Sequence, residues 1–166
     1  MLEMRQLMSS SMFGDFNGDG FDDLAIGVPG EDIGTTVDAG AVNVIYGSAT
    51  GLTSVGNEIW HQNSPGIAGA SQANDRFGSA LAAGDFDNDG YTDLAIGVPG
   101  EDIGTIVDAG AVNVIYGSAT GLTNVNDDIW HQNTPNINGA SEIGDNFGSA
   151  LAVGDFDNNG RDDLAV

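Results

Sequence analysis

Three short segments of this chain place acidic or amide side chains at alternating positions, and each has a glycine at its sixth position. The clearest is DFDNDGYTD, which begins at Asp85 and ends at Asp93. Gly90 permits a sharp turn there, so side chains at positions 1, 3, 5 and 9 and the carbonyl at position 7 can surround one ion. Calcium takes about six to eight oxygen ligands, most of which such a loop supplies.

We therefore expect Ca²⁺ in these loops, about one ion per loop and up to three in the chain. An EF-hand is excluded, because it requires flanking helices and a glutamate at position 12, where this chain has Ile26, Ile96 and Val166. The simpler alternative is a set of Asp/Asn/Gly-rich turns without an ion. The expected ligands are the side chains of Asp15, Asn17, Asp19, Asp23, Asp85, Asp87, Asp89, Asp93, Asp155, Asp157, Asn159 and Asp163, and the carbonyls of Phe21, Tyr91 and Arg161.

The charge of the chain fits a partner that is a cation. Its 166 residues include 25 acids, three arginines and no lysine, which gives a formal net charge of −22. Nucleic acids and anionic membranes are excluded as partners, since both require basic patches. The chain has no cysteine, so neither disulfides nor thiolate metal sites are possible.

The acidic loops belong to a repeat, because Asp15, Asp85 and Asp155 lie 70 residues apart. The segment DLAIGVPGEDIGT recurs unchanged at 23–35 and 93–105. We divide the chain into an N-terminal segment or partial first strand (1–14), two full units and a partial third unit whose first strand begins near 147. The full units span 15–84 and 85–154, and the partial unit spans 155–166.

The elements that must position these loops are strands, because apolar residues alternate with a period of two and no segment has a helical period. In the second unit we expect strands at 77–84, 93–98, 110–116 and 127–132, with copies 70 residues earlier or later. Both faces of these strands are apolar, as they must be in a blade packed between neighbours. The pattern predicts an all-β fold of four-stranded antiparallel β-propeller blades; a β-sandwich with an internal duplication is the alternative.

The segment FGSALAAGDFDNDGYTDLAIGVPG (77–100) resembles the FG-GAP repeat of the integrin alpha-subunit β-propeller. Phe77 and Gly78 match the FG, and Gly97-Val98-Pro99 stands for the GAP with valine in place of alanine. FGSALAVGDFDNNGRDDLAV (147–166) matches in the same way, and the first copy matches from Asp15 onward. The near-identical units are similar to bacterial tandem FG-GAP proteins. The resemblance implies blades with calcium in their hairpins, and with it we expect an extracellular or cell-surface location.

No catalytic constellation is present, so we do not expect an enzyme. YGSATG is not a G-x-S-x-G elbow, and there is no phosphate-binding glycine loop. We expect a structural or protein-interaction module with an adhesion-like role. The alternatives are a lectin-like carbohydrate binder with a pocket near Trp60 or Trp130, and the propeller part of a larger extracellular hydrolase. His61 and His131 fit polar strand ends, and Glu101 with Asp102 fits a solvated loop that could supplement a calcium site.

Two and a half units cannot close a ring, so the outer blade faces should remain bare. We expect these faces to carry Leu24, Ile26, Val44 and Leu81 and to drive homo-oligomerisation, because exposed apolar patches favour association. In this interpretation the first strand of the third unit, 147–154, completes the N-terminal blade of a neighbouring molecule. The sequence does not identify any other protein or carbohydrate partner.

Overall fold

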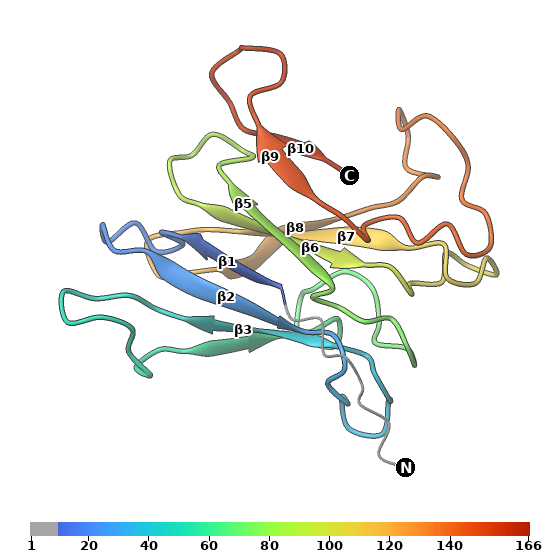
Figure 1. Ribbon diagram of the computed structural model, residues 1–166, viewed down its shortest axis with the longest axis horizontal. Helices are drawn as coiled ribbons and strands as arrows, with labels where there is room; N and C mark the ends of the chain where they lie inside the picture. Colours follow the sequence, from blue (N-terminus) through green and yellow to red (C-terminus); the bar gives the residue numbers. More distant parts are fainter. Residues whose placement is uncertain (1–9) are drawn as a thin grey trace.

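The computed structural model describes residues 10–166, which form three antiparallel sheets (Figure 1). Two sheets have four strands, in the orders β1-β2-β3-β4 and β5-β6-β7-β8, and the third is the β9–β10 hairpin. Within this part of the chain no helix is long and apolar enough to cross a lipid bilayer. The strands are β1 (Ser11–Gly14), β2 (Asp23–Val28), β3 (Ala41–Ile45), β4 (Glu58–Trp60), β5 (Ala80–Gly84), β6 (Asp93–Val98), β7 (Ala111–Tyr116), β8 (Thr123–Trp130), β9 (Ala152–Gly154) and β10 (Asp163–Ala165).

The second sheet is packed on both faces, as the all-β propeller-blade prediction requires. All six residues of β6 are buried, and the first sheet lies on one side of it while the β9–β10 hairpin lies on the other (Figure 1). Its larger side chains, including Leu94 and Ile96, pack against Val42 and Phe16 of the first blade. Its smaller face, including Ala95, packs against the β9–β10 hairpin. Each blade thus presents a large face to the preceding blade and a small face to the following one.

The bare face of the first blade is less extensive than the sequence suggested. In β2, Leu24 and Ile26 are half-buried, as expected for a face without a neighbour. Val44 and Leu81 are instead buried in the core between the first two blades, so the prediction that they line a bare face is wrong. Val44 lies on the small face of the first blade and Leu81 on the large face of the second, and these two faces meet.

The first strand of each blade begins later than the alternation predicts. The second blade's first strand starts at Ala80 rather than at residue 77, because Phe77 forms a parallel bridge with Gly40 of the first blade. Gly78 then has a φ of +90°, which interrupts the strand. The fourth strand ends at Trp130 rather than at residue 132, because His131 opens a turn closed by Thr134. In the first blade β1 covers 11–14; Ser10 precedes the strand, and the other predicted positions, 7–9, lie outside the described residues.

The FG dipeptide thus connects adjacent blades. The carbonyl oxygen of Gly78 lies 2.0 Å from the position that a Cβ at Gly27 would occupy, so only glycine fits there. The same contact recurs between Gly148 and Gly97 at the next junction. The glycine of the GVP turn in one unit therefore accepts the FG of the following unit, which fixes the spacing between blades.

Candidate metal centre

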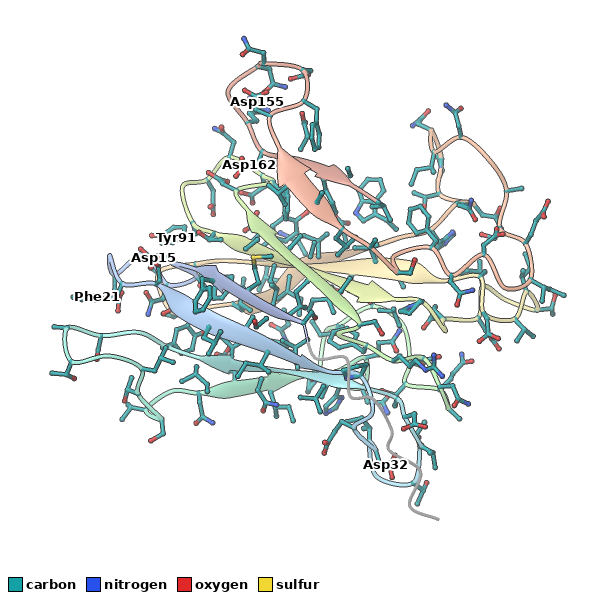
Figure 2. The ribbon with its side chains drawn as sticks, in the orientation of Figure 1. Asp15, Phe21, Asp32, Tyr91, Asp155 and Asp162 are labelled. Carbon is teal, nitrogen blue, oxygen red and sulfur yellow. The ribbon has the colours of Figure 1, made fainter. Side chains whose placement is uncertain are left out.

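The three acidic loops occupy equivalent places in the three sheets, since they join β1 to β2, β5 to β6 and β9 to β10. The connections from β2 to β3 and from β6 to β7 leave the opposite end of the same strands. Figure 2 shows this separation in the first blade, where Asp15 and Phe21 lie at one end and Asp32 at the other. The repeat therefore brings the loops to one edge of successive blades.

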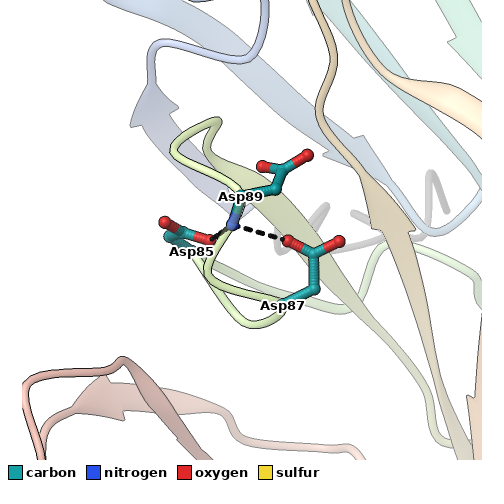
Figure 3. A group of neighbouring side chains, drawn as sticks. All are labelled: Asp85, Asp87 and Asp89. Atoms are coloured by element: carbon teal, nitrogen blue, oxygen red, sulfur yellow. Dashed lines mark hydrogen bonds between the residues drawn. The ribbon is translucent and has the colours of Figure 1, made fainter.

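The middle loop gathers three carboxylates around its backbone turn (Figure 3). Asp85, Asp87 and Asp89 each offer an oxygen atom within 4.8 Å of the others. The amide of Asp89 donates to Oδ1 of Asp85 at 3.0 Å and to Oδ1 of Asp87 at 3.1 Å. The amide of Gly90, whose φ is +94°, donates to Oδ2 of Asp85 at 3.0 Å. These amides hold the carboxylates near one another despite their like charges.

The aspartate at position 9 of the loop is buried and has a structural role of its own. Asp93 is 0% exposed; its Oδ2 accepts from the amide of Phe86 at 2.7 Å and its Oδ1 from Gly117 at 2.9 Å. Burial is the main cause that raises the pKa of Asp93 to about 6, and nearby Asp87 adds to this. Asp93 therefore ties the start of the loop to the chain that follows β7. Asp23 makes the same two bonds in the first blade, and burial raises its pKa as well.

The third and first loops differ from the middle one. In the third loop Asp155, Asp157 and Asp163 form the close group, and Asp163 accepts from the amide of Phe156 at 2.9 Å. The first loop is not among the groups of three acidic or histidine ligands formed by residues 10–166. Its second ligand is an amide: Asn17 accepts from the amide of Asp19 at 2.9 Å and donates to Oδ2 of Asp19 at 3.3 Å.

Position 7 of each loop is fixed by the side chain at position 5. The amides of Phe21 and Tyr91 donate to Asp19 and Asp89 at 3.0 and 2.9 Å, and that of Arg161 donates to Asn159 at 2.8 Å. The ligand role expected of the three carbonyls at position 7 stays a prediction. The predicted side-chain ligands offer carboxylate or amide oxygen, the donor set that calcium prefers. The residues present therefore fit calcium chemically.

Successive loops also contact one another. The ring of Tyr91 packs over Gly18 of the preceding loop, where an added Cβ would lie 2.5 Å from the ring. The amide of Thr92 donates to the carbonyl of Asp15 at 3.3 Å. At the next junction the amide of Asp85 donates to Oδ2 of Asp162 at 3.0 Å. The conformation of one loop therefore depends on its neighbours.

At the opposite end of the blades the structure places a group that sequence reasoning missed. Glu101 was expected in a solvated loop, but it is 6% exposed and accepts a hydrogen bond from Gln62. Asp75 lies beside this turn and is 1% exposed. Glu31, which occupies the same place in an identical segment of the first unit, is exposed. The two segments have the same sequence, so the different exposure of the two glutamates comes from the neighbouring blade.

The histidines and tryptophans give no support for a sugar pocket. Trp60 packs against the core between the blades and donates to Glu58 at 3.0 Å, while Trp130 is 39% exposed. Neither tryptophan lines the two cavities described, of about 310 and 280 Å³, in this part of the chain. His61 is half-buried, and this burial lowers its pKa.

Comparison with known proteins agrees with this architecture. The family model described as "FG-GAP repeat" matches residues 9–45, 77–115 and 147–166, more than half of the chain. Over 92% of its length the chain is 36% identical to phosphatidylinositol-glycan-specific phospholipase D of Mus musculus, 34% to integrin alpha-PS5 of Drosophila melanogaster and 32% to integrin alpha-V of Gallus gallus. These matches span 17%, 14% and 13% of the three relatives, so the chain covers less than a fifth of each. With its repeated acidic hairpins and FG contacts between blades, the chain belongs to the FG-GAP repeat family.

Proposed function

We propose that this chain is a calcium-binding propeller module in which each ion stabilises the hairpin of one blade. The observation that carries the proposal is the middle loop, where Asp85, Asp87 and Asp89 hold carboxylate oxygens within 4.8 Å of one another. The described loop presents no basic side chain to offset them, and the whole chain has no lysine. Like charges this close repel, so a cation that neutralises them should contribute much of its binding free energy to folding.

Thermal unfolding with millimolar calcium and with EDTA tests this function. We expect calcium to raise the melting temperature strongly, and we expect the three loops to bind up to three ions per chain by isothermal titration calorimetry. Asp89→Ala should remove one ion. Its matched control is Glu142→Ala, which removes an exposed acid outside the loops. Identical melting curves in calcium and in EDTA would show that the loops are ordinary acidic turns.

The proposed role is binding or structural rather than catalytic, and the proposed location is extracellular or at the cell surface. Extracellular calcium modules bind with dissociation constants of about 10⁻⁴–10⁻³ M, which suits short loops of this kind. One relative is named as a phospholipase, but the matched region covers 17% of it. We therefore assign this chain the repeat module alone, and an adhesion-like interaction as its role.

We also propose that the module associates head to tail with a second copy through its outer blade faces. The junction inside the chain provides the template. Phe16 of the first loop is 0% exposed, and its carbonyl accepts from the amide of Ser118 in the following blade at 3.2 Å. Its equivalent in the third loop, Phe156, is 63% exposed. The first blade carries the complementary surface, a groove of about 310 Å³ lined by residues that include Phe21, Gly47, Ser48 and Leu52.

This docking differs from the strand exchange expected from the sequence. The first-strand position of the N-terminal blade is already filled, because β1 pairs with β2 from Ser11 to Gly14. In the proposed contact the hairpin of one copy lies against the intact first blade of the next. Repetition of such a contact closes a ring when the rotation permits and otherwise forms a filament.

Light scattering in calcium, with the protein at tens of micromolar, tests the association. We expect a mass above that of the monomer, and we expect Phe156→Ser to return the protein to monomer. Ile143→Ser is the control, because Ile143 is 76% exposed on a loop away from both docking surfaces. A soluble wild-type monomer would refute the association and leave the calcium proposal intact.

A further inference from the structure

The first two blades also meet at the end opposite the acidic loops, and there the chain buries acidic groups. Asp75 lies in the connection from β4 to β5, and Glu101 lies just after β6. The amide of Gly100 donates to the carbonyl of Asp75 at 3.1 Å, so the two segments are in contact. The approach is so close that a Cβ at Gly100 would lie 2.0 Å from the carbonyl oxygen of Asn74.

Three side chains converge at this contact, and we call Gln62, Asp75 and Glu101 the junction cluster. Gln62 donates through Nε2 to Oε2 of Glu101 at 2.5 Å. Asp75 accepts through Oδ2 from the amide of Gln72. The other oxygens, Oδ1 of Asp75 and Oε1 of Gln62, are buried and have no hydrogen-bond partner among residues 10–166, and these two residues are 1% and 2% exposed.

Within residues 10–166, no basic side chain is among the charged groups that influence the cluster. The charged groups that influence Asp75 are carboxylates, those of Asp102 and Asp108, and Asp75 in turn influences Glu101. Burial is the main cause that raises the pKa of Asp75 to about 6 and that of Glu101 to about 7. Buried acceptors without partners are rare in native proteins, where each is usually satisfied by a protein group, water or an ion.

We propose that the junction cluster is a second kind of cation site, which binds a hard divalent ion such as calcium between adjacent blades. The ligands on the chain are carboxylate oxygens of Asp75 and Glu101 and the amide oxygen of Gln62, a set of the oxygen donors that calcium takes. Water completes the coordination. The site joins two units, since Gln62 and Asp75 end one unit and Glu101 belongs to the next. It is independent of the hairpin loops and of the function proposed for them.

The repeat supplies internal controls for this site. Glu31 has the same neighbours in sequence as Glu101, but no connection from a preceding blade covers it in the described structure, and it is exposed. Gln132 and Asp145 are the equivalents of Gln62 and Asp75 in the second unit, and Oε1 of Gln132 is likewise buried without a partner. The described residues contain no equivalent of Glu101 one repeat period later. One complete junction cluster is therefore present in residues 10–166.

Calcium binding to matched variants tests the site. By equilibrium dialysis at pH 7.5, Glu101→Gln should bind one ion fewer per chain than the wild type, whereas Glu31→Gln should bind the same number. Asp75→Asn should repeat the loss seen with Glu101→Gln. An unchanged ion count in both junction variants would overturn the proposal. The same result is expected if the two carboxylates share a proton and bind no metal.

A second measurement uses the wild-type chain and so does not depend on the folding of a variant. Substoichiometric Mn²⁺ broadens nuclear magnetic resonance signals close to it. Addition of Mn²⁺ should broaden the side-chain amide signals of Gln62, and this broadening should be absent in Glu101→Gln. The side-chain amide of Gln132 is the internal control and should stay sharper. Equal intensities for the two glutamines throughout the titration would refute the site.

Discussion

Replacement of Asp93 by asparagine should have opposite consequences with and without calcium. The carboxylate of Asp93 is 0% exposed and accepts hydrogen bonds from the amides of Phe86 and Gly117. It is also the proposed ligand at position 9 of the middle loop. Asparagine keeps the size of the side chain but removes the charge, and its NH₂ group replaces one of the two acceptors.

The magnitude without calcium follows from the raised pKa. The pKa of Asp93 is about 6 in the folded protein and 3.8 in the reference state, so at pH 7 the buried charge costs about 3 kcal/mol of stability. The variant avoids this cost. It loses one hydrogen bond and places its NH₂ donor against a backbone amide donor, which costs about 1–3 kcal/mol. The first effect equals or exceeds the second, and we expect the free energy of unfolding at pH 7 in EDTA to rise by about 2 kcal/mol or less.

With calcium the balance reverses, because the ion stabilises the carboxylate that the variant lacks. Loss of an ion present at a hundred times its dissociation constant removes about 2.7 kcal/mol, which outweighs the gain of the variant in EDTA. We therefore expect a net loss of about 1–3 kcal/mol in saturating calcium.

Urea unfolding of the wild type and the variant, in calcium and in EDTA, measures both differences. Glu142→Gln is the matched control, since it removes one exposed charge outside the acidic loops. The pH dependence provides an independent test. Because the folded protein holds the proton of Asp93 more tightly than the unfolded chain, the EDTA form should gain stability as pH falls from 7 through 6 toward 4. A loss of stability in the variant that is equal in calcium and in EDTA would refute this reasoning.

Three further predictions concern single contacts and sites. Gly78→Ala should destabilise the chain by about 2 kcal/mol more than Gly90→Ala in urea unfolding. Both glycines have a positive φ, but a Cβ meets the backbone only at Gly78, where it would lie 2.8 Å from the carbonyl oxygen of Ala41. Tyr46→Phe should reduce the free energy of unfolding by about 1–3 kcal/mol, since it leaves a buried backbone amide of the next blade unpaired. Tyr116→Phe, whose hydroxyl donates to a side chain of its own blade, should cost less. Graded chelation followed by nuclear magnetic resonance should empty the middle loop last, because four of its predicted ligands are carboxylates and each of the other loops has three carboxylate ligands.

The repeat and its period of two were sufficient to predict the fold, because strand alternation and blade stacking both leave a mark in local sequence. The segment DLAIGV forms a strand in both units, as expected. Its burial, however, differs: β2 alternates between buried and half-buried residues, whereas β6 is buried throughout. Identical residues cannot encode that difference, which comes from the blade that lies against the second copy.

The same limit explains which site residues could be predicted. The acidic loops are local, so their ligand spacing is visible in nine consecutive residues. The hydrogen bonds of Asp93 to Gly117 and the junction cluster join residues 24 to 39 positions apart. Such contacts follow from how strands and blades pack, and a local motif does not contain them. Asp93, the first residue of β6, was therefore identified as a ligand, while its role in closing the hairpin was not.

Cations at both ends of a blade junction would act on the same packing surface. The acidic loops lie at one end of the core that joins the first two blades, and the junction cluster lies at the other. Along the array, Tyr91 packs on the preceding loop and Asp162 accepts from the amide of Asp85, so each loop is held partly by the next. An ion that orders one loop thereby orders the surface that its neighbour contacts. In a chain with a formal net charge of −22, neutralisation by the proposed cations and adhesion between blades would be one process, and we expect blade stacking to strengthen as the sites fill.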